Sequence, residues 1–260
     1  MTDTVIAAQM YTAREFTKTT KDAAESLKKV REIGYEAVQI SAFGADIDFN
    51  DIKQMLDDNG LYCCITHIGY DRLKDDLPAV IEQHKLWNCP NVAIGSMPGP
   101  FRESGVDGVK KFAAEANEIG RQLHEAGLTF SYHNHSFEFA RAGEGKETIM
   151  DILFDETDPK DVHAELDTYW VQHGGADPAT WILKMKDRMP VVHVKDMTIE
   201  PPRTQVMAEV GEGNLNWPAI LDACKEAGVQ YYAVEQDICP GDPFDSLAIS
   251  YKNMRAMGLK

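Results

Sequence analysis

Positive charge is scarce in this sequence. Its 260 residues include 26 lysines and arginines against 42 aspartates and glutamates, which gives a formal net charge of −16 at pH 7. Nucleic acids and anionic membrane surfaces would repel such a chain, so the composition predicts neither as a partner. A polyanionic substrate is disfavoured for the same electrostatic reason.

Long apolar runs and cysteine pairs are also missing. No run approaches the roughly 18 apolar residues that are needed to span a bilayer, and the polar start MTDTVIAAQ is unlike a signal peptide. The five cysteines are odd in number and form no CxxC pair, which is typical of structural cysteines in a reduced compartment. These features predict a cytoplasmic protein.

One pattern recurs along the chain: an amphipathic helix, a glycine and a short apolar strand. It occurs in LKKVREIGYEAVQI, MLDDNGLYCCIT, LHEAGLTFSYH and CKEAGVQYYAV. Glycine just past a helix end takes the left-handed conformation that stops the helix. Four further strands fit around 5–11, 91–96, 163–168 and 191–196, which makes eight. Helices are expected at 20–33, 49–59, 75–88, 105–126, 146–156, 177–188, 214–227 and 243–257.

Eight alternating strands and helices in 260 residues predict an α/β protein with a single (β/α)8 barrel, a TIM barrel, as one domain over residues 1–260. An open doubly wound sheet is the alternative. It would favour a glycine-rich turn after the first strand, and QMYTAREF contains no glycine. The closed barrel is therefore the better prediction.

Polar side chains alternate with apolar ones near the ends of the expected strands. In HAELDTYW at 163–170, Glu165 and Asp167 oppose Ala164 and Leu166. The same alternation assigns these polar side chains to the barrel interior: Gln9, Tyr11, Gln39, Ser41, His67, Ser131, His133, His135, His193, Lys195, Glu235 and Asp237. Purely structural barrel interiors hold mainly branched aliphatic residues, so this pattern predicts a functional site at the C-terminal mouth.

Four of these residues suit a metal ion. His133, Asp167, His193 and Glu235 come one from each of the last four expected strands, so their side chains can converge. Two imidazoles and two carboxylates suit one divalent ion such as Mn²⁺, Zn²⁺, Co²⁺ or Mg²⁺. A hydrogen-bonded polar network without metal is the alternative.

The runs ELDTYW at 165–170, VVHVKDM at 191–197 and AVEQD at 233–237 resemble the xylose isomerase-like barrel superfamily of sugar and sugar-phosphate isomerases and epimerases. That superfamily includes the inosose dehydratases and, more distantly, endonuclease IV. The resemblance covers essentially the whole chain. It implies a metal held by Glu, Asp, His and Glu, the last three of which correspond to Asp167, His193 and Glu235.

The first family glutamate has no counterpart here. The equivalent strand reads SYHNH, and His133 is assigned to the ligand position, with Asn134 and His135 as alternatives. Family epimerases use two opposed glutamates to remove and return a proton, and of these only Glu235 is matched. The sequence therefore departs from the family at one of its metal and proton-transfer positions.

The resemblance implies a metal-dependent isomerase or epimerase that acts on a sugar or keto-sugar through an enediolate. Glu235 is the expected base, and the second acid or base is Glu138, His135 or Lys195. The main alternative is a dehydratase or lyase of the inosose dehydratase type, which removes the same proton and then expels a β-hydroxyl or alkoxide. A repair nuclease is disfavoured by the negative charge, and a non-catalytic sugar-binding barrel is the remaining alternative.

Four further residues are candidates for contact with the sugar: Gln9, His67, Tyr169 and Trp170. For the aromatic pair and for His67, ordinary packing is the competing interpretation. Two of the catalytic candidates also have structural interpretations: Glu138 as a solvated loop carboxylate, and Lys195 as an ion-pair partner of an interior carboxylate such as Glu165.

The segment GEGNLNW at 211–217 resembles a family loop that covers the site. It contains no lysine or arginine, and ICPGDPFD after the last strand is acidic, so a sugar without phosphate is expected. Association into a homo-oligomer is left open.

Overall fold

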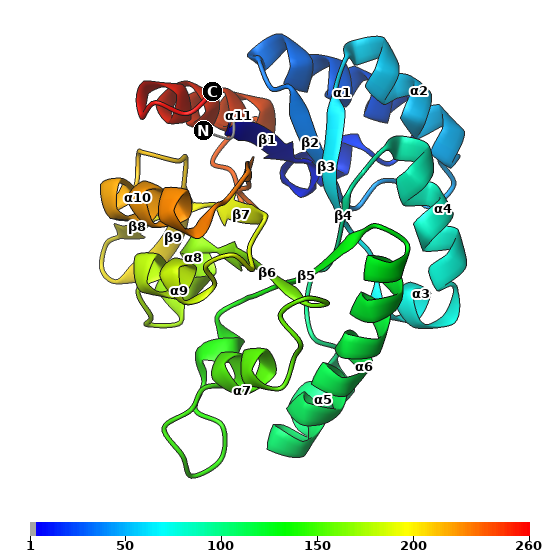
Figure 1. Cartoon of the computed structure of the whole chain (residues 1–260). Coiled ribbons are helices and arrows are strands. Elements are labelled where there is room, and N and C mark those ends of the chain that lie inside the picture. Colours follow the sequence, from blue (N-terminus) through cyan, green and yellow to red (C-terminus); the bar gives the residue numbers. More distant parts are fainter. Residues whose placement is uncertain (1–3) are drawn as a thin grey trace.

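The computed structural model describes residues 4–260 and contains a closed barrel of eight parallel strands (Figure 1). Around the barrel the strands follow the order β1-β10-β7-β6-β5-β4-β3-β2. Their bounds are Val5–Gln9 (β1), Ala37–Ile40 (β2), Tyr62–His67 (β3), Asn91–Ile94 (β4), Thr129–His133 (β5), His163–Asp167 (β6), Val191–Val194 (β7) and Tyr231–Val234 (β10). The predicted (β/α)8 barrel is confirmed, and the open sheet is excluded.

Helices surround the strands in Figure 1, and each of the eight expected helices is present. They are Thr20–Ile33 (α1), Phe49–Asn59 (α2), Leu77–Trp87 (α4), Gly105–Glu125 (α6), Ile149–Asp155 (α7), Pro178–Lys184 (α9), Trp217–Ala227 (α10) and Pro243–Ala256 (α11). None of the helices within residues 4–260 is long and apolar enough to cross a bilayer.

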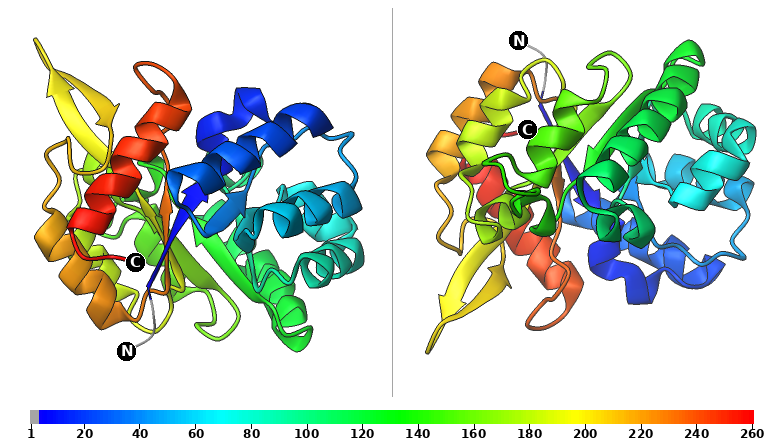
Figure 2. Two further views of the ribbon diagram at one scale, coloured as in Figure 1. Left: turned by 90° about the horizontal axis from the view of Figure 1, so that it is seen from above. Right: turned by 90° about the horizontal axis from the view of Figure 1, so that it is seen from below.

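Short elements in the loops were missed by the sequence analysis. They are the 3₁₀ helices Met10–Phe16 (η1) and Phe137–Phe139 (η2), the helices Tyr70–Asp75 (α3), Gly99–Glu103 (α5) and Thr168–His173 (α8), and a hairpin of Asp196–Glu200 (β8) and Thr204–Ala208 (β9). They are too short to show a clear hydrophobic period. The hairpin projects away from the barrel (Figure 2).

Local sequence explains why helix α1 begins and ends where it does. The Thr19 side chain caps its start by accepting a hydrogen bond from the amide of Asp22. Gly34 follows the helix with φ of 125°, a backbone conformation that a residue with a Cβ rarely adopts. Between these signals, Ala23, Leu27 and Val30 are buried on one face.

The core has two layers, as the alternation along the strands predicts. Outward-facing residues such as Ile6, Ala8 and Val38 pack against the helices in a large cluster. Inside the barrel a small cluster is made mostly of short side chains: Ala7, Ala37, Cys64, Ile65, Ala93, Val191 and Ala233. This inner layer fills the middle of the barrel and leaves the C-terminal mouth to polar residues.

The register between neighbouring strands places the polar residues of the site at the same height along the barrel axis. Asp167 of β6 pairs in register with His193 of β7, and Ala233 of β10 lies opposite His193 on its other side. On the neighbouring strand, His133 of β5 lies beside Glu165. Because parallel strands keep a constant register, these side chains project into the same volume at the mouth.

His84 in α4 is a buried histidine outside the barrel. Its Nδ1–H donates to the carbonyl of Val80 at 2.7 Å, and its Nε2 accepts from the Thr66 hydroxyl at 2.7 Å. Burial lowers the pKa of His84 to about 4, although the hydrogen bond to Val80 acts in the opposite direction and raises it. The folded protein therefore holds this ring neutral at pH values where the unfolded chain binds a proton.

We predict that His84 makes the protein less stable in mild acid. As pH falls from 6.5 towards 4 the unfolded state gains the proton first, so the free energy of unfolding should drop by up to about 3 kcal/mol through this residue. Urea unfolding at pH 7 and pH 4.5 should show a smaller drop for His84→Gln than for the natural protein. Equal drops in the two proteins would contradict the prediction.

Candidate metal centre and active site

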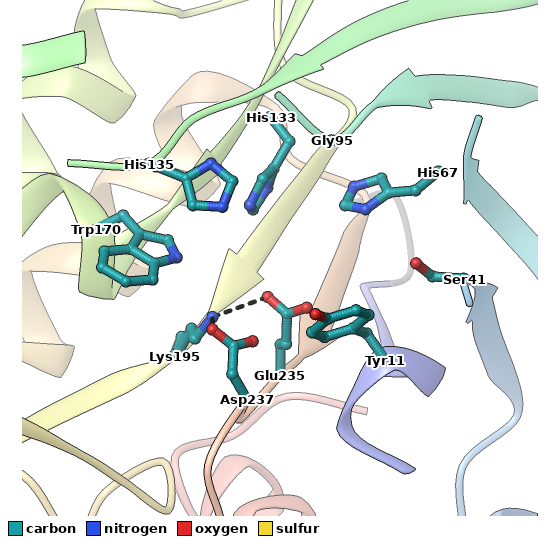
Figure 3. Close-up of a pocket in the computed structure, with 10 residues that line it drawn as sticks. All are labelled: Tyr11, Ser41, His67, Gly95, His133, His135, Trp170, Lys195, Glu235 and Asp237. Atoms are coloured by element: carbon teal, nitrogen blue, oxygen red, sulfur yellow. Dashed lines mark hydrogen bonds and ion pairs between the residues drawn. The ribbon is translucent and has the colours of Figure 1, made fainter. Parts of the chain in front are cut away.

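A cavity of about 250 Å³ opens at the C-terminal mouth of the barrel (Figure 3). Its walls carry residues from the ends of six strands and from the adjoining loops. The lining residues are Tyr11, Ser41, His67, Gly95, His133, His135, Trp170, Lys195, Glu235 and Asp237. We call it the mouth cavity.

The four predicted metal ligands converge at the base of the mouth cavity. His133, Asp167, His193 and Glu235 each offer one ligand atom, and these atoms all lie within 4.8 Å of one another. All four side chains are buried. The chain therefore contains a histidine and carboxylate cluster that could hold a metal ion.

A second group overlaps the first. His67, His133, Glu165 and His193 also offer ligand atoms within 4.8 Å of one another. Alternation along β6 predicted an interior position for Glu165, but Glu165 was not among the predicted ligands. The parity that Glu165 shares with Asp167 could have identified it, because both carboxylates point inward from the same strand.

Several polar atoms of the cluster have no hydrogen bond within residues 4–260. They are Nδ1 of His133, Oε1 of Glu165 and Oδ2 of Asp167, all buried. A buried polar atom that lacks a well-formed hydrogen bond costs free energy, so these atoms can gain from a further partner. A divalent ion fits here, because imidazole and carboxylate are its usual ligands. Two of these oxygens also have ion-pair partners, Lys195 for Oδ2 of Asp167 and His193 for Oε1 of Glu165, so a metal-free polar network stays the alternative.

His193 lies between carboxylates. Its Nδ1 is 3.0 Å from Oε2 of Glu235, and its Nε2 is 3.1 Å from Oε1 of Glu165 and 2.7 Å from Oε1 of Gln39. Burial alone would lower the pKa of His193, but the charges of Glu165 and Glu235 raise it well above its ordinary value. A metal at His193 would therefore compete with a proton.

Lys195 is fully buried and ion-paired. Its Nζ lies 2.8 Å from Asp237, 3.1 Å from Glu235 and 3.4 Å from Asp167. Burial would lower the pKa of Lys195, yet these carboxylates raise it above its ordinary value. The ammonium is therefore charged. The interpretation of Lys195 as an ion-pair partner of interior carboxylates is thus confirmed, but the partners are Asp167, Glu235 and Asp237. The suggested partner Glu165 contacts His67 and His193 instead.

The carboxylates around Lys195 differ in acidity. Burial raises the pKa of Asp167 to about 7, although the charge of Lys195 opposes the shift. Burial would also raise the pKa of Glu235, but the charges of Lys195 and His193 lower it below its ordinary value. Glu235 is thus the more firmly ionised of these two carboxylates.

Glu138 does not reach the mouth cavity. It is fully buried and accepts hydrogen bonds from the hydroxyl of Tyr132 at 2.7 Å and from the amide of His135 at 2.9 Å. Tyr132 faces the helices, away from the barrel interior. Burial raises the pKa of Glu138 to about 7, against the Tyr132 hydrogen bond. The interpretation of Glu138 as a solvated carboxylate is therefore wrong. The side chain lies outside the mouth cavity and holds the loop that carries His135.

His135 lines the mouth cavity beside Trp170, with ring centres 5.3 Å apart. Burial and the positive charge of Lys195 lower the pKa of His135 to about 4. The ring is therefore neutral at pH 7 and can accept a proton or a hydrogen bond.

The candidates for substrate contact divide into two pairs. His67 and Trp170 line the mouth cavity, whereas Gln9 and Tyr169 are buried behind it. Four of the lining residues had no predicted site role: Tyr11, Ser41, Gly95 and Asp237. Three of these had the inward parity of their strands; Gly95 carried no such signal.

Residues 211–217 do not line the mouth cavity, in contrast to the covering loop implied by the resemblance. The amides of Gly211, Gly213 and Leu215 and the indole N–H of Trp217 donate to the buried carboxylate of Asp196. A Cβ on Gly213 would lie 2.3 Å from Oδ1 of Asp196, so the close approach requires glycine. The segment therefore braces the base of the β8–β9 hairpin.

The comparison with protein families matches a model described as "xylose isomerase-like TIM barrel" to residues 27–238. The chain belongs to this family. An inosose dehydratase from Geobacillus thermodenitrificans is 28% identical over 148 residues, which cover 50% of this chain and 48% of that protein. The chain thus matches about half the length of this curated relative.

Solved structures share the fold over nearly the whole chain. A sugar phosphate isomerase/epimerase from Parabacteroides distasonis superposes with a TM-score of 0.78 at 24% identity, covering 97% of this chain and 94% of that one. A probable 3-DHS dehydratase from Bacillus anthracis gives a TM-score of 0.74 at 11% identity, covering 96% and 98%. Isomerase and dehydratase names thus both occur among the relatives, as the family resemblance implies.

We predict that Asp167→Asn will weaken divalent-metal binding by more than about 100-fold, because it removes a charged ligand atom from the cluster. Elemental analysis and metal titration of the purified protein would measure the loss. Asp237→Asn is the matched control, because Asp237 contacts Lys195 but lies outside both ligand groups.

Glu165→Gln separates the two overlapping ligand groups. If the predicted group binds the ion, this variant should retain the metal within about tenfold, because Glu165 then acts only on neighbouring rings. Loss of the metal in Glu165→Gln with retention in Asp167→Asn would contradict the assignment of Asp167 and Glu235.

Proposed function

We propose that this chain is a divalent-metal-dependent enzyme that removes a proton next to the carbonyl of a sugar or keto-sugar. The observation that supports this most is the geometry of the mouth cavity. Neutral His135 and charged Lys195 both line the cavity beside Trp170, above a buried cluster that could hold a metal. A divalent ion bound there would polarise the carbonyl and stabilise the negative charge that forms on its oxygen.

The side chains of this chain then have distinct roles. His135, neutral and lining the cavity, accepts the proton from carbon. Glu235 would hold the metal and fixes Lys195, whose Nζ lies 3.1 Å away, so the oxygens of Glu235 are engaged and not available as the base. Lys195 donates a hydrogen bond, and then a proton, to a substrate oxygen on its own side of the cavity.

Two outcomes can follow from the first step. Isomerisation or epimerisation returns a proton to carbon, whereas elimination expels an oxygen substituent from the β-carbon. Both carboxylates that line the cavity, Glu235 and Asp237, follow β10 and pair with Lys195. Histidines from the ends of β3 and β5 line other parts of the cavity wall. This pairing of a neutral base with a charged acid favours elimination over an exchange between two equivalent glutamates, and the dehydratase names among the relatives agree with it.

The substrate is proposed to lack phosphate. Among the described residues 4–260, Lys195 is the only lysine or arginine that lines the mouth cavity. Three carboxylates already surround its ammonium group. A phosphate dianion would meet more negative than positive charge there. The cytoplasmic location and the association of copies stay predictions.

We predict that the Mg²⁺- or Zn²⁺-loaded protein, incubated in D₂O with a methyl keto-glycoside, will release methanol and form an enone. NMR spectroscopy follows both products, and it also detects deuterium at the carbon next to the carbonyl. Deuterium uptake without methanol release would assign isomerisation or epimerisation. No exchange with any keto-sugar would overturn the proposed function.

Lys195→Met should separate the two half-reactions. Methanol release is expected to fall by about 10²-fold or more, because the leaving oxygen loses its proton donor. Proton exchange at carbon should fall less, since it depends on His135. Lys184→Met is the matched control, because Lys184 lies on the surface and pairs with Asp151. An equal loss of exchange and release in Lys195→Met would contradict the role given to Lys195.

A further inference from the structure

A second cavity adjoins the mouth cavity. It has a volume of about 340 Å³ and lies under the loop between β2 and α2. Residues from that loop, from α2, β3, α3 and α4 line it. Ser41 and His67 line both cavities, so the two spaces meet at these residues. We call this space the annex cavity.

The walls of the annex cavity are mostly apolar. They include Ile40, Phe43, Ile47, Phe49, Ile52, Ile68 and Trp87. Phe49 and Trp87 meet edge to face with ring centres 5.8 Å apart, and the Trp87 indole N–H donates to the backbone carbonyl of Phe49. The indole is thus fixed in orientation. Rigid aromatic walls of this kind favour a planar aromatic group over a flexible polar one.

One polar atom in this apolar surface needs a partner. Gln83 lines the annex cavity and is 5% exposed. Its buried Oε1 makes no hydrogen bond to any residue between 4 and 260. An unpaired carbonyl oxygen in a buried position is costly, and a ligand hydroxyl would relieve that cost by donating to it. Arg72, at the rim, lies over the Phe49 ring.

The barrel fixes which part of a substrate enters the annex cavity. In the closed strand order, β3 stands four strands from β7 in either direction, so His67 lies opposite Lys195. Figure 3 shows Ser41 and His67 on one side of the mouth cavity, with Lys195 and Trp170 on the other. The annex cavity therefore faces the part of the sugar that is remote from the oxygen protonated by Lys195.

We propose that the annex cavity binds a hydroxyaryl substituent of the substrate, with its hydroxyl donating to Oε1 of Gln83. The identification of the ligand as part of the substrate rests on the proposed function. The existence of the binding site does not depend on that function. The substrate is then a keto-sugar with a phenolic group attached away from the leaving oxygen. Sugars without such a group still react, but they bind more weakly.

Binding of a small probe tests the site without any reaction. 4-Ethylphenol and ethylbenzene differ by one hydroxyl, and NMR saturation transfer with competition titration compares their affinities. The natural protein should bind 4-ethylphenol about tenfold more tightly than ethylbenzene, because one buried acceptor gains its donor. Gln83→Met keeps the shape of the side chain but removes the acceptor, so it should abolish this preference.

Two variants fill the annex cavity. Ile52→Phe places a larger side chain on the buried face of α2. Ala45→Phe places one in the loop before α2, where residue 45 is exposed, so the substitution should not disturb folding. Either should weaken both probes at least about tenfold. Absence of probe binding in the folded natural protein would overturn the proposal, as would probe affinities unchanged in both Ala45→Phe and Gln83→Met.

Kinetics separate this proposal from the proposed function. Ala45→Phe should raise KM for a keto-sugar that carries a hydroxyphenyl group, but leave kcat/KM for the unsubstituted keto-sugar unchanged. Deuterium exchange with the unsubstituted sugar tests the chemistry alone. Probe binding without deuterium exchange would contradict the proposed reaction but support the annex cavity as a binding site. Deuterium exchange without probe binding would support the reaction but overturn the binding site.

Discussion

The buried negative charge at the barrel mouth is the constraint on which the site depends. Glu165, Asp167 and Glu235 are all buried within one cluster, and charged groups in such surroundings must be compensated. Lys195 and His193 supply part of the compensation, and they hold the carboxylates in fixed positions. The same excess of carboxylate over cation makes the cluster suited to a divalent ion. Proton position, metal affinity and side-chain geometry are therefore coupled in this region.

Much of the fold and the core of the site could be predicted from the sequence, because both follow from periodicity. Alternation along a strand is a geometric property of the backbone, so it placed His133, Asp167 and His193 inward without knowledge of their partners. Prediction failed where the strands end. The chain turns at η2 and carries Glu138 to the outer face against Tyr132, and no periodic signal describes such a turn. The partners of Lys195 depend on packing across the mouth, which sequence spacing does not determine.

Asp196 shows how the loops are held while the site keeps its polar residues. One carboxylate collects four donors from the segment that follows the hairpin. Glu138 has a comparable role after β5, where it ties the loop amide of His135 to Tyr132. Buried acids outside the mouth cavity thus fix the loops from which His135 and the hairpin project. The precision of the site is a property of these supports as well as of the strands.

The inner layer of short side chains beneath the site also affects how substrate enters and products leave. Four alanines in this layer allow the strands to pack closely around the barrel axis: Ala7, Ala37, Ala93 and Ala233. Little space is then left along the axis below the site. This layer closes the mouth cavity on the side of the barrel axis. A substrate and the products of its cleavage would therefore all pass the loops at the C-terminal end of the barrel.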